Sequence, residues 1–220
     1  MKLPIIVTNF KAYDGASGEK ALELALIHEK VAKETGVNIA IAVQALDLWN
    51  IASRVSIPVF AQHVDPVQYG AFTGSVVPEA VKVAGAFGTL LNHSEKRLSF
   101  DMLRLSIERA NQAGLFVIVC AATPEEGSNF LSYQPDFIAV EPPELIGGDV
   151  SVSSAQPHII TKAVELVGEN RLLVGAGVKN AQDVRIAVEL GASGVLLASG
   201  VTKAKNPEFV LQDLVSGLQY

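Results

Sequence analysis

Short, continuous runs of apolar residues recur along the whole chain and alternate with segments whose apolar residues have helical spacing. A continuous apolar run of this length is typical of a strand that is buried on both faces, as in a parallel sheet. Eight runs are therefore predicted to be strands, at residues 5–10, 39–44, 59–64, 88–93, 116–121, 137–142, 172–177 and 194–199.

The segments between the runs are predicted to be helices, the clearest at residues 19–34, 100–113, 181–190 and 207–218. Ser99 and Asn206 precede two of these segments as N-cap residues, and Pro207 suits a first helical turn. Glycines stand where helices are expected to end, at Gly36, Gly114, Gly168 and Gly191.

Eight strand–helix units in 220 residues favour a (β/α)8 barrel, an α/β fold of the TIM-barrel type with eight parallel strands. An open doubly wound sheet more often has five or six units and a G-x-G-x-x-G fingerprint after its first strand. Here the first strand is followed by NFKAYDGASG. No linker or low-complexity tract interrupts the alternation, so one domain is predicted over residues 1–220.

Composition narrows the class of protein. Apolar residues make up 49% of the chain, but the longest apolar run, residues 115–122, is far below the roughly 18 residues of a membrane helix. The N-terminal stretch lacks the pattern of a signal peptide. Cys120 is the single cysteine, which excludes an internal disulfide and a multi-cysteine metal site. We therefore expect a cytoplasmic protein, and the net charge of −6 argues against nucleic acid or an anionic membrane as partner.

Polar and titratable residues stand where several apolar runs end, and in a barrel those ends form the active-site face. Asn9 and Lys11 follow the first run. Because their spacing is two, an extended backbone would place both side chains on the same side. A lysine there suits a phosphate or a developing oxyanion, whereas the alternative is a solvated loop lysine.

His93 ends the fourth run, in LLNHSEKR. It is a candidate acid/base or electrophilic imidazole, and a short helix beginning at the next Ser-Glu pair would lower its pKa. The alternative is an ordinary core or surface histidine. His63, at the end of the third run, is a rival candidate, whereas His28 and His158 lie in helical segments and are predicted to be surface residues.

Glu141 ends the sixth run, where a buried carboxylate is costly unless it is paired or used, and where its pKa would rise. A salt-bridged glutamate at the barrel rim is the alternative. The two prolines that follow stiffen the chain, and two glycines loosen it after an apolar tip. This arrangement predicts a lid that excludes water. The predicted lid comprises Pro142, Pro143, Glu144, Leu145, Ile146, Gly147 and Gly148.

The last two runs end in small residues, VGAGV at residues 174–178 and LLASG at residues 196–200. Small residues let the backbone approach a ligand closely, and loops after the seventh and eighth strands of a barrel commonly bind phosphate. A tight turn with small-residue packing is the alternative for GAG taken alone.

In their order and spacing, NFKAY, LNHSEKR, AVEPPELIG, GAG and GVLLASGVTKA resemble the triosephosphate isomerase family, specifically its short archaeal type. The resemblance covers nearly the whole chain. It implies interconversion of dihydroxyacetone phosphate and D-glyceraldehyde 3-phosphate through an enediolate, in glycolysis and gluconeogenesis, without metal or organic cofactor. It also implies self-association as a homodimer or homotetramer, with the loop at residues 65–76 docking into a neighbouring subunit.

The resemblance also implies roles for individual residues. Glu141 would be the base that moves the proton between two carbons. His93 would be the neutral electrophile that polarises the carbonyl group. Lys11 would stabilise the anionic substrate and enediolate, Asn9 would orient the oxygen region, and Glu95 would arrange charge around the site. The phosphate would be held by Ile146 through its backbone, Gly177, Ala198 and Ser199.

Two features depart from the family pattern. The lid reads LIGGD where LIGTG is expected, and the segment between the lid and LLVGAG is a few residues short. Among enzymes, the alternative is another phosphate-binding barrel, such as a sugar-phosphate isomerase or an aldolase. An alternative from a different class is a catalytically inactive barrel that serves as a binding or assembly module. An aldolase would need a Schiff-base lysine inside a barrel strand, and no predicted strand carries one. An inactive barrel would predict loss of Glu141 or His93.

Overall fold

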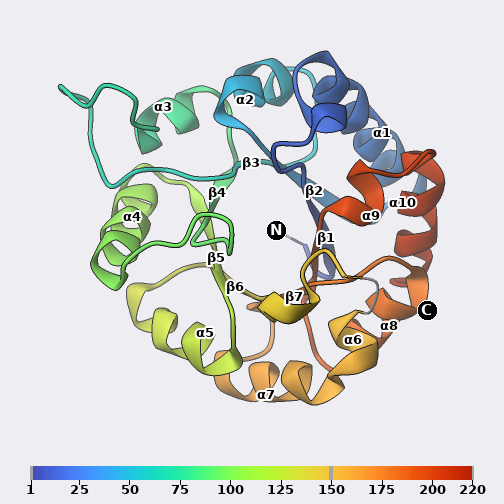
Figure 1. Ribbon diagram of the computed structural model, residues 1–220. Coiled ribbons are helices and arrows are strands. Elements are labelled where there is room, and N and C mark those ends of the chain that lie inside the picture. Colours follow the sequence, from blue (N-terminus) through green and yellow to red (C-terminus); the bar gives the residue numbers. More distant parts are fainter. Residues whose placement is uncertain (1, 149–150, 220) are drawn as a thin grey trace.

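The computed structural model describes residues 2–148 and 151–219, and over these residues eight parallel strands close into a barrel in chain order (Figure 1). The strands are β1 (Ile5–Asn9), β2 (Asn38–Val43), β3 (Val59–Ala61), β4 (Gly88–Leu91), β5 (Phe116–Ala121), β6 (Phe137–Val140), β7 (Leu172–Gly175) and β8 (Gly194–Leu197). The predicted TIM barrel is confirmed. Most strands end earlier than predicted.

Helices surround the barrel (Figure 1). They are α1 (Glu19–Thr35), α2 (Ala45–Ala52), α3 (Pro78–Val83), α4 (Phe100–Gln112), α5 (Pro124–Phe130), α6 (Val152–Ala155), α7 (Pro157–Val167), α8 (Ala181–Glu189), α9 (Ser199–Thr202) and α10 (Pro207–Ser216), with short 3-10 turns η1 (Asp14–Ala16), η2 (Leu131–Tyr133) and η3 (Pro143–Leu145). The predicted N-caps are confirmed, since the side chain of Ser99 accepts from the Met102 amide and that of Asn206 from the Phe209 amide.

Both faces of the strands are buried. In β7, Leu173 points into an apolar cluster inside the barrel, whereas Leu172 and Val174 join the larger cluster between the barrel and its helices. Side chains of a strand alternate between its two faces, so a strand covered on both sides must be apolar at successive positions. This two-sided burial explains the continuous apolar runs.

His28 corrects one prediction. It is fully buried on α1, where its Nδ1 donates to the Leu24 carbonyl oxygen at 2.7 Å and its ring lies 5.3 Å from the ring of Phe10. Burial lowers the pKa of His28 to about 4. The spacing of four from Leu24 places His28 on the apolar face of the helix, which the residue type alone conceals. His158 is exposed, as predicted.

Because the strands are parallel in a closed barrel, their carboxyl ends meet at one rim, which gathers the candidate residues. The loop between β3 and α3 projects outward from the barrel (Figure 1). Within residues 2–148 and 151–219, no helix combines the length and apolarity needed to span a bilayer.

Candidate active site

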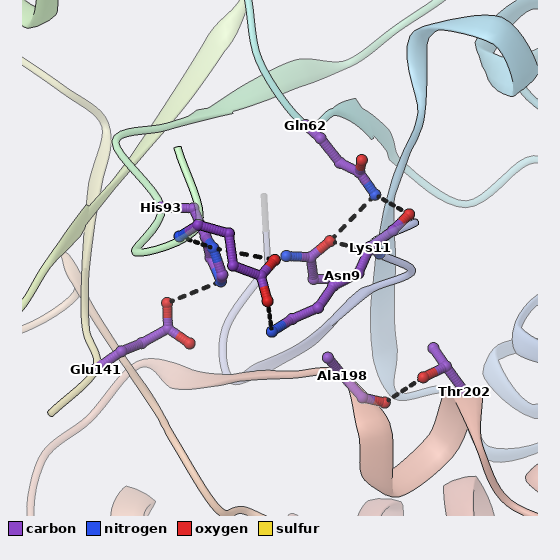
Figure 2. Close-up of polar contacts among 8 residues, drawn as sticks. Asn9, Lys11, Gln62, His93, Glu141, Ala198 and Thr202 are labelled. Atoms are coloured by element: carbon purple, nitrogen blue, oxygen red, sulfur yellow. Dashed lines mark hydrogen bonds and ion pairs between the residues drawn. The ribbon is translucent and has the colours of Figure 1, made fainter. Parts of the chain in front are cut away.

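Asn9 and Lys11 lie together at the end of β1 (Figure 2). The Lys11 amide donates to Asn9 Oδ1 at 2.9 Å, and Gln62 Nε2 donates to Asn9 Oδ1 at 3.2 Å and to the Lys11 carbonyl oxygen at 2.9 Å. Lys11 has a left-handed backbone, with φ of 52°. A turn of the backbone at Lys11 therefore brings the two side chains to the same cavity. The extended backbone that was expected from their spacing of two is wrong.

The ammonium group of Lys11 pairs with Glu95. Lys11 Nζ lies 2.7 Å from Glu95 Oε1, and the Lys11 side chain is only 9% exposed. The Glu95 side chain is 57% exposed, so it meets the lysine from the solvent side. A long side chain held at its tip by a carboxylate and at its backbone by Asn9 has a restricted position. The cation is thereby directed toward the mouth of the barrel.

His93 follows β4 and is buried. Its Nδ1 accepts the Glu95 amide at 3.2 Å, so in the neutral ring the proton is on Nε2, which lies 3.7 Å from Glu141 Oε2 (Figure 2). Burial and the Lys11 charge lower the pKa of His93, against the opposing effect of Glu95. The short helix predicted after His93 is wrong, since a turn follows it and α4 begins at Phe100. Burial takes the place of the expected helix terminus in keeping the ring neutral.

Glu141 follows β6 directly, and its amide donates to the Ala121 carbonyl oxygen at 2.9 Å. Its side chain is buried, and within the described residues its Oε2 has no hydrogen-bond partner. Burial raises the pKa of Glu141 to about 7, although the neighbouring Cys120 thiol and Lys11 oppose the rise. The acid therefore ionises near neutral pH.

Gly175, the last residue of β7, leaves room for Glu141. A Cβ at this position would lie 2.7 Å from both Cγ and Oε1 of Glu141. Such a distance is far inside ordinary contact, so any other residue would displace the carboxylate. The small residues of VGAGV were predicted to let the backbone approach a ligand closely. Gly175, the first glycine of this motif, also leaves space for the Glu141 side chain.

One cavity joins these groups with the ends of β7 and β8. The predicted residues that line it are Asn9, Lys11, His93, Glu141, Ile146, Gly147, Gly148, Gly177, Ala198 and Ser199. Glu95 is absent from this lining and acts on it through Lys11. Sequence reasoning missed Tyr13 and Lys179, which also line it. Tyr13 is the last residue of the motif NFKAY and Lys179 directly follows GAGV, and these positions were the available signal.

The phosphate-binding candidates from the ends of β7 and β8 line the same cavity. Thr202 Oγ1 donates to the Ala198 carbonyl oxygen at 3.1 Å and steadies the turn of α9, which begins at Ser199 (Figure 2). The first amides of a helix have no intrahelical acceptor. Gly177 has a left-handed φ of 72° and lines the cavity from the loop after β7. The two loops therefore face the same space with small side chains.

The predicted lid, residues 142–148, reaches the cavity only with the residues at the tip of the lid. Pro143–Leu145 forms the turn η3, and the Gly148 amide donates to the Leu145 carbonyl oxygen at 3.1 Å. Gly147 has a left-handed φ of 71°. Ile146 and the two glycines line the cavity, whereas residues 142–145 do not. Asp149, the last residue of the divergent LIGGD motif, lies outside the described residues.

His63, the rival candidate, lies outside this cavity. His63 Nε2 lies 3.0 Å from Asp65 Oδ1, and the ring lines an adjacent cleft that it shares with Gln44 and Lys96. It does not reach the cavity that contains Glu141. In the part of the chain that the structure describes, no group of three or more His, Cys, Asp or Glu side chains could hold a metal ion.

Comparison with known proteins identifies the family. The family model described as "Triosephosphate isomerase" matches residues 4–217. Triosephosphate isomerase from Methanobacterium bryantii is 47% identical over 217 residues, covering 97% of this chain and 96% of that protein. Triosephosphate isomerase from Saccharolobus solfataricus is 45% identical over 219 residues, covering 98% and 96%.

A solved structure supports the fold. The crystal structure of triosephosphate isomerase from Bartonella henselae matches with a TM-score of 0.74 and 18% identity, covering 99% of this chain and 98% of that chain. At this identity the likeness concerns the fold. The full-length relatives, many from archaea, agree with the archaeal-type resemblance and set aside the aldolase and binding-module alternatives. The chain therefore belongs to the triosephosphate isomerase family and is an isomerase of triose phosphates.

Proposed function

We propose that the chain interconverts dihydroxyacetone phosphate and D-glyceraldehyde 3-phosphate by proton transfer through an enediolate, with Glu141 as the base. One observation carries this proposal. A buried carboxylate whose pKa is raised to about 7 faces the Nε2 of a neutral imidazole at 3.7 Å over a single cavity. A general base is most effective when its pKa lies near the working pH.

In the first step, ionised Glu141 removes the proton from the carbon beside the carbonyl group. The electron pair of that C–H bond forms the carbon–carbon double bond, and the carbonyl oxygen takes the negative charge. Protonated Glu141 then returns the proton to the neighbouring carbon. Glu141 Oε2 supports this role, because among the described residues it has no hydrogen-bond partner to give up.

His93, Lys11 and Asn9 stabilise the charge that develops on oxygen. His93 donates through Nε2–H and moves protons between the two oxygens, and the Glu95 amide at Nδ1 supports this assignment of the ring proton. Lys11 supplies a positive charge from a side chain that is only 9% exposed, and electrostatic stabilisation is strongest where water is excluded. Glu95 holds the lysine in place, and Asn9 orients the substrate oxygens.

The lid and the small-residue loops bind the phosphate. Ile146 through its backbone, together with Gly177, Ala198 and Ser199, surrounds the phosphate when residues 142–148 close. Their common cavity and the position of Ser199 at the start of α9 support this role. Closure excludes water, which protects the enediolate and strengthens each charge interaction.

The substitution Glu141→Gln tests the base directly. We expect kcat to fall about 10²–10⁴-fold, the usual contribution of a positioned general base, while a substrate analogue still binds. Glu189→Gln, an exposed glutamate on α8, is the matched control and should keep full turnover. Isotope exchange from the substrate carbon into solvent reports the proton transfer. Full turnover in Glu141→Gln would overturn the proposal.

We infer the wider setting from the same assignment. Residues 1–220 act as one domain in glycolysis and gluconeogenesis in the cytoplasm, without a cofactor. The chain self-associates as a homodimer or homotetramer. The projecting loop at residues 65–76 supports self-association, since Tyr69 is 63% and Phe72 is 48% exposed on it. Its base is held by Asp65, whose amide donates to the Val76 carbonyl oxygen at 2.9 Å and whose Oδ2 accepts the Val76 amide at 2.7 Å.

A further inference from the structure

Asp183 connects two segments that border the active-site cavity. It lies in the first turn of α8 and is 5% exposed. Its Oδ1 accepts Ser151 Oγ at 2.5 Å and Ser154 Oγ at 3.2 Å, and its Oδ2 accepts the Lys179 amide at 3.0 Å. The serines belong to the segment that follows the lid, and Lys179 belongs to the loop after β7.

The geometry points to Asp183 as a positioning residue that fastens the segment after the lid to the phosphate-binding loop after β7. We name this set of contacts the aspartate clamp: Asp183, Ser151, Ser154 and the Lys179 amide. The inference rests on the proposed function, because it concerns a lid that closes over phosphate. In this inference, the carboxylate of Asp183 connects the segment after the lid with the loop after β7.

A helix cap alone does not account for these contacts. Asn180 already caps α8, since its Oδ1 accepts the Asp183 amide at 2.9 Å. Asp183 instead accepts hydroxyl groups from residues 29 and 32 positions earlier in the chain. Hydrogen bonds to a buried carboxylate are stronger than those between neutral groups, so the clamp is a firm connection.

A backbone contact runs beside the clamp. The Val152 amide donates to the Ala176 carbonyl oxygen at 3.1 Å, which joins the same two segments. Ser151 also caps α6, since its hydroxyl oxygen accepts the Ser154 amide at 3.1 Å. The segment that follows the lid is therefore anchored at several points to the loop that carries Ala176, Gly177 and Lys179.

The cavity explains what this anchoring achieves. Gly177 and Lys179 of the loop after β7 line the cavity, and so does Ile146 of the lid. The clamp orients the loop after β7 and also holds the segment that follows the lid. The two segments that contact the phosphate are therefore positioned relative to each other before the lid closes. Phosphate binding then gains affinity, because fewer segments must be ordered at the moment of closure.

Asp183→Asn tests the clamp with almost no change in shape. An asparagine has one acceptor oxygen, so it can serve either the serines or the Lys179 amide, and its NH2 group faces a donor on the other side. We expect kcat/KM for D-glyceraldehyde 3-phosphate to fall about 10–100-fold, as a lost hydrogen bond to a charged group implies. Isomerisation of D-glyceraldehyde, which lacks the phosphate, should change less than about threefold.

The serines provide a second test with a matched control. Ser151→Ala and Ser154→Ala should each reduce the ratio of the two kcat/KM values in the same direction as Asp183→Asn. Ser153→Ala removes a buried hydroxyl group from the same helix, and that hydroxyl has no hydrogen-bond partner within the described residues. This control should leave the ratio unchanged. The serine variants also keep the test open if Asp183→Asn fails to fold.

The ratio of the two substrates distinguishes positioning from a merely structural role. If the variants of Asp183 and Ser151 lowered both activities equally, or left the ratio as in the parent, the clamp would be refuted. Glu141→Gln lowers both activities if the proposed base is right. If the clamp is refuted while Glu141→Gln is inactive, the proposed function still stands. Full turnover in Glu141→Gln would instead overturn the proposed function itself.

Discussion

The ionisation of Glu141 depends on its immediate neighbours. Burial raises its pKa to about 7, and the Cys120 thiol and Lys11 oppose that rise. Burial, strengthened by the Glu141 charge, raises the pKa of Cys120, so the thiol keeps its proton and can donate it. The base works when ionised, so kcat/KM should rise with pH through about 7 and level off above it.

Cys120→Ala should move this rise to higher pH, because it removes a hydrogen bond that favours ionised Glu141. We expect kcat/KM about threefold below the parent at about pH 6 and equal to it at about pH 9. Cys120→Ser, which retains a donor, is the control and should follow the parent profile. Identical profiles for the alanine variant and the parent would show that the thiol does not influence the base.

At the scale of elements, the lid depends on the backbone of one residue. Gly147 has φ of 71°, and a Cβ added there would meet no atom of the described residues within 4 Å. A substitution at Gly147 therefore adds backbone strain without a collision. The cost is about 1–2 kcal/mol for a residue with a side chain in this region.

Gly147→Ala should lower kcat/KM about tenfold by biasing the lid away from the conformation that meets the cavity. Gly36→Ala is a close match, because Gly36 has φ of 72° and equally free surroundings at the end of α1. It should cost similar stability in thermal unfolding and leave the kinetics unchanged. Equal kinetics in the two variants would mean that the tip of the lid tolerates any backbone shape.

At the scale of the whole molecule, the loop at residues 65–76 carries exposed aromatic side chains away from the barrel (Figure 1). Aromatic side chains at the centre of an interface commonly contribute most of the binding energy. The double variant Tyr69→Ser/Phe72→Ser should weaken self-association about a hundredfold or more. Sedimentation velocity measures this change.

Phe209→Ser is the control for this prediction, since Phe209 is 67% exposed on α10 and lies outside the loop. It should leave the sedimentation profile of the parent unchanged. A parent chain that sediments as a monomer at micromolar concentration would contradict the prediction of a homodimer or homotetramer. Unchanged association in the double variant would place the interface on another face.

Much of the fold could be predicted because its signals are local. Burial on both strand faces requires successive apolar residues, and helix caps act within one turn, so both leave a record in adjacent positions. Several candidate residues were found for a similar reason, since Asn9, His93 and Glu141 each stand at the end of an apolar run, whereas Glu95 was found through the family resemblance. Asn9, His93 and Glu141 reach one cavity because parallel strands bring their carboxyl ends to one rim.

The sequence by itself determined the barrel, its strand order and the family to which the chain belongs. Only the tertiary structure decided how Lys11 turns, that Gly175 makes room for Glu141, and that Asp183 holds the segment after the lid. It also decided that His28 is buried. These features depend on side chains that are distant in the chain and meet through the register of the closed sheet. No pattern of neighbouring residues encodes such a meeting, because it arises only when the barrel closes.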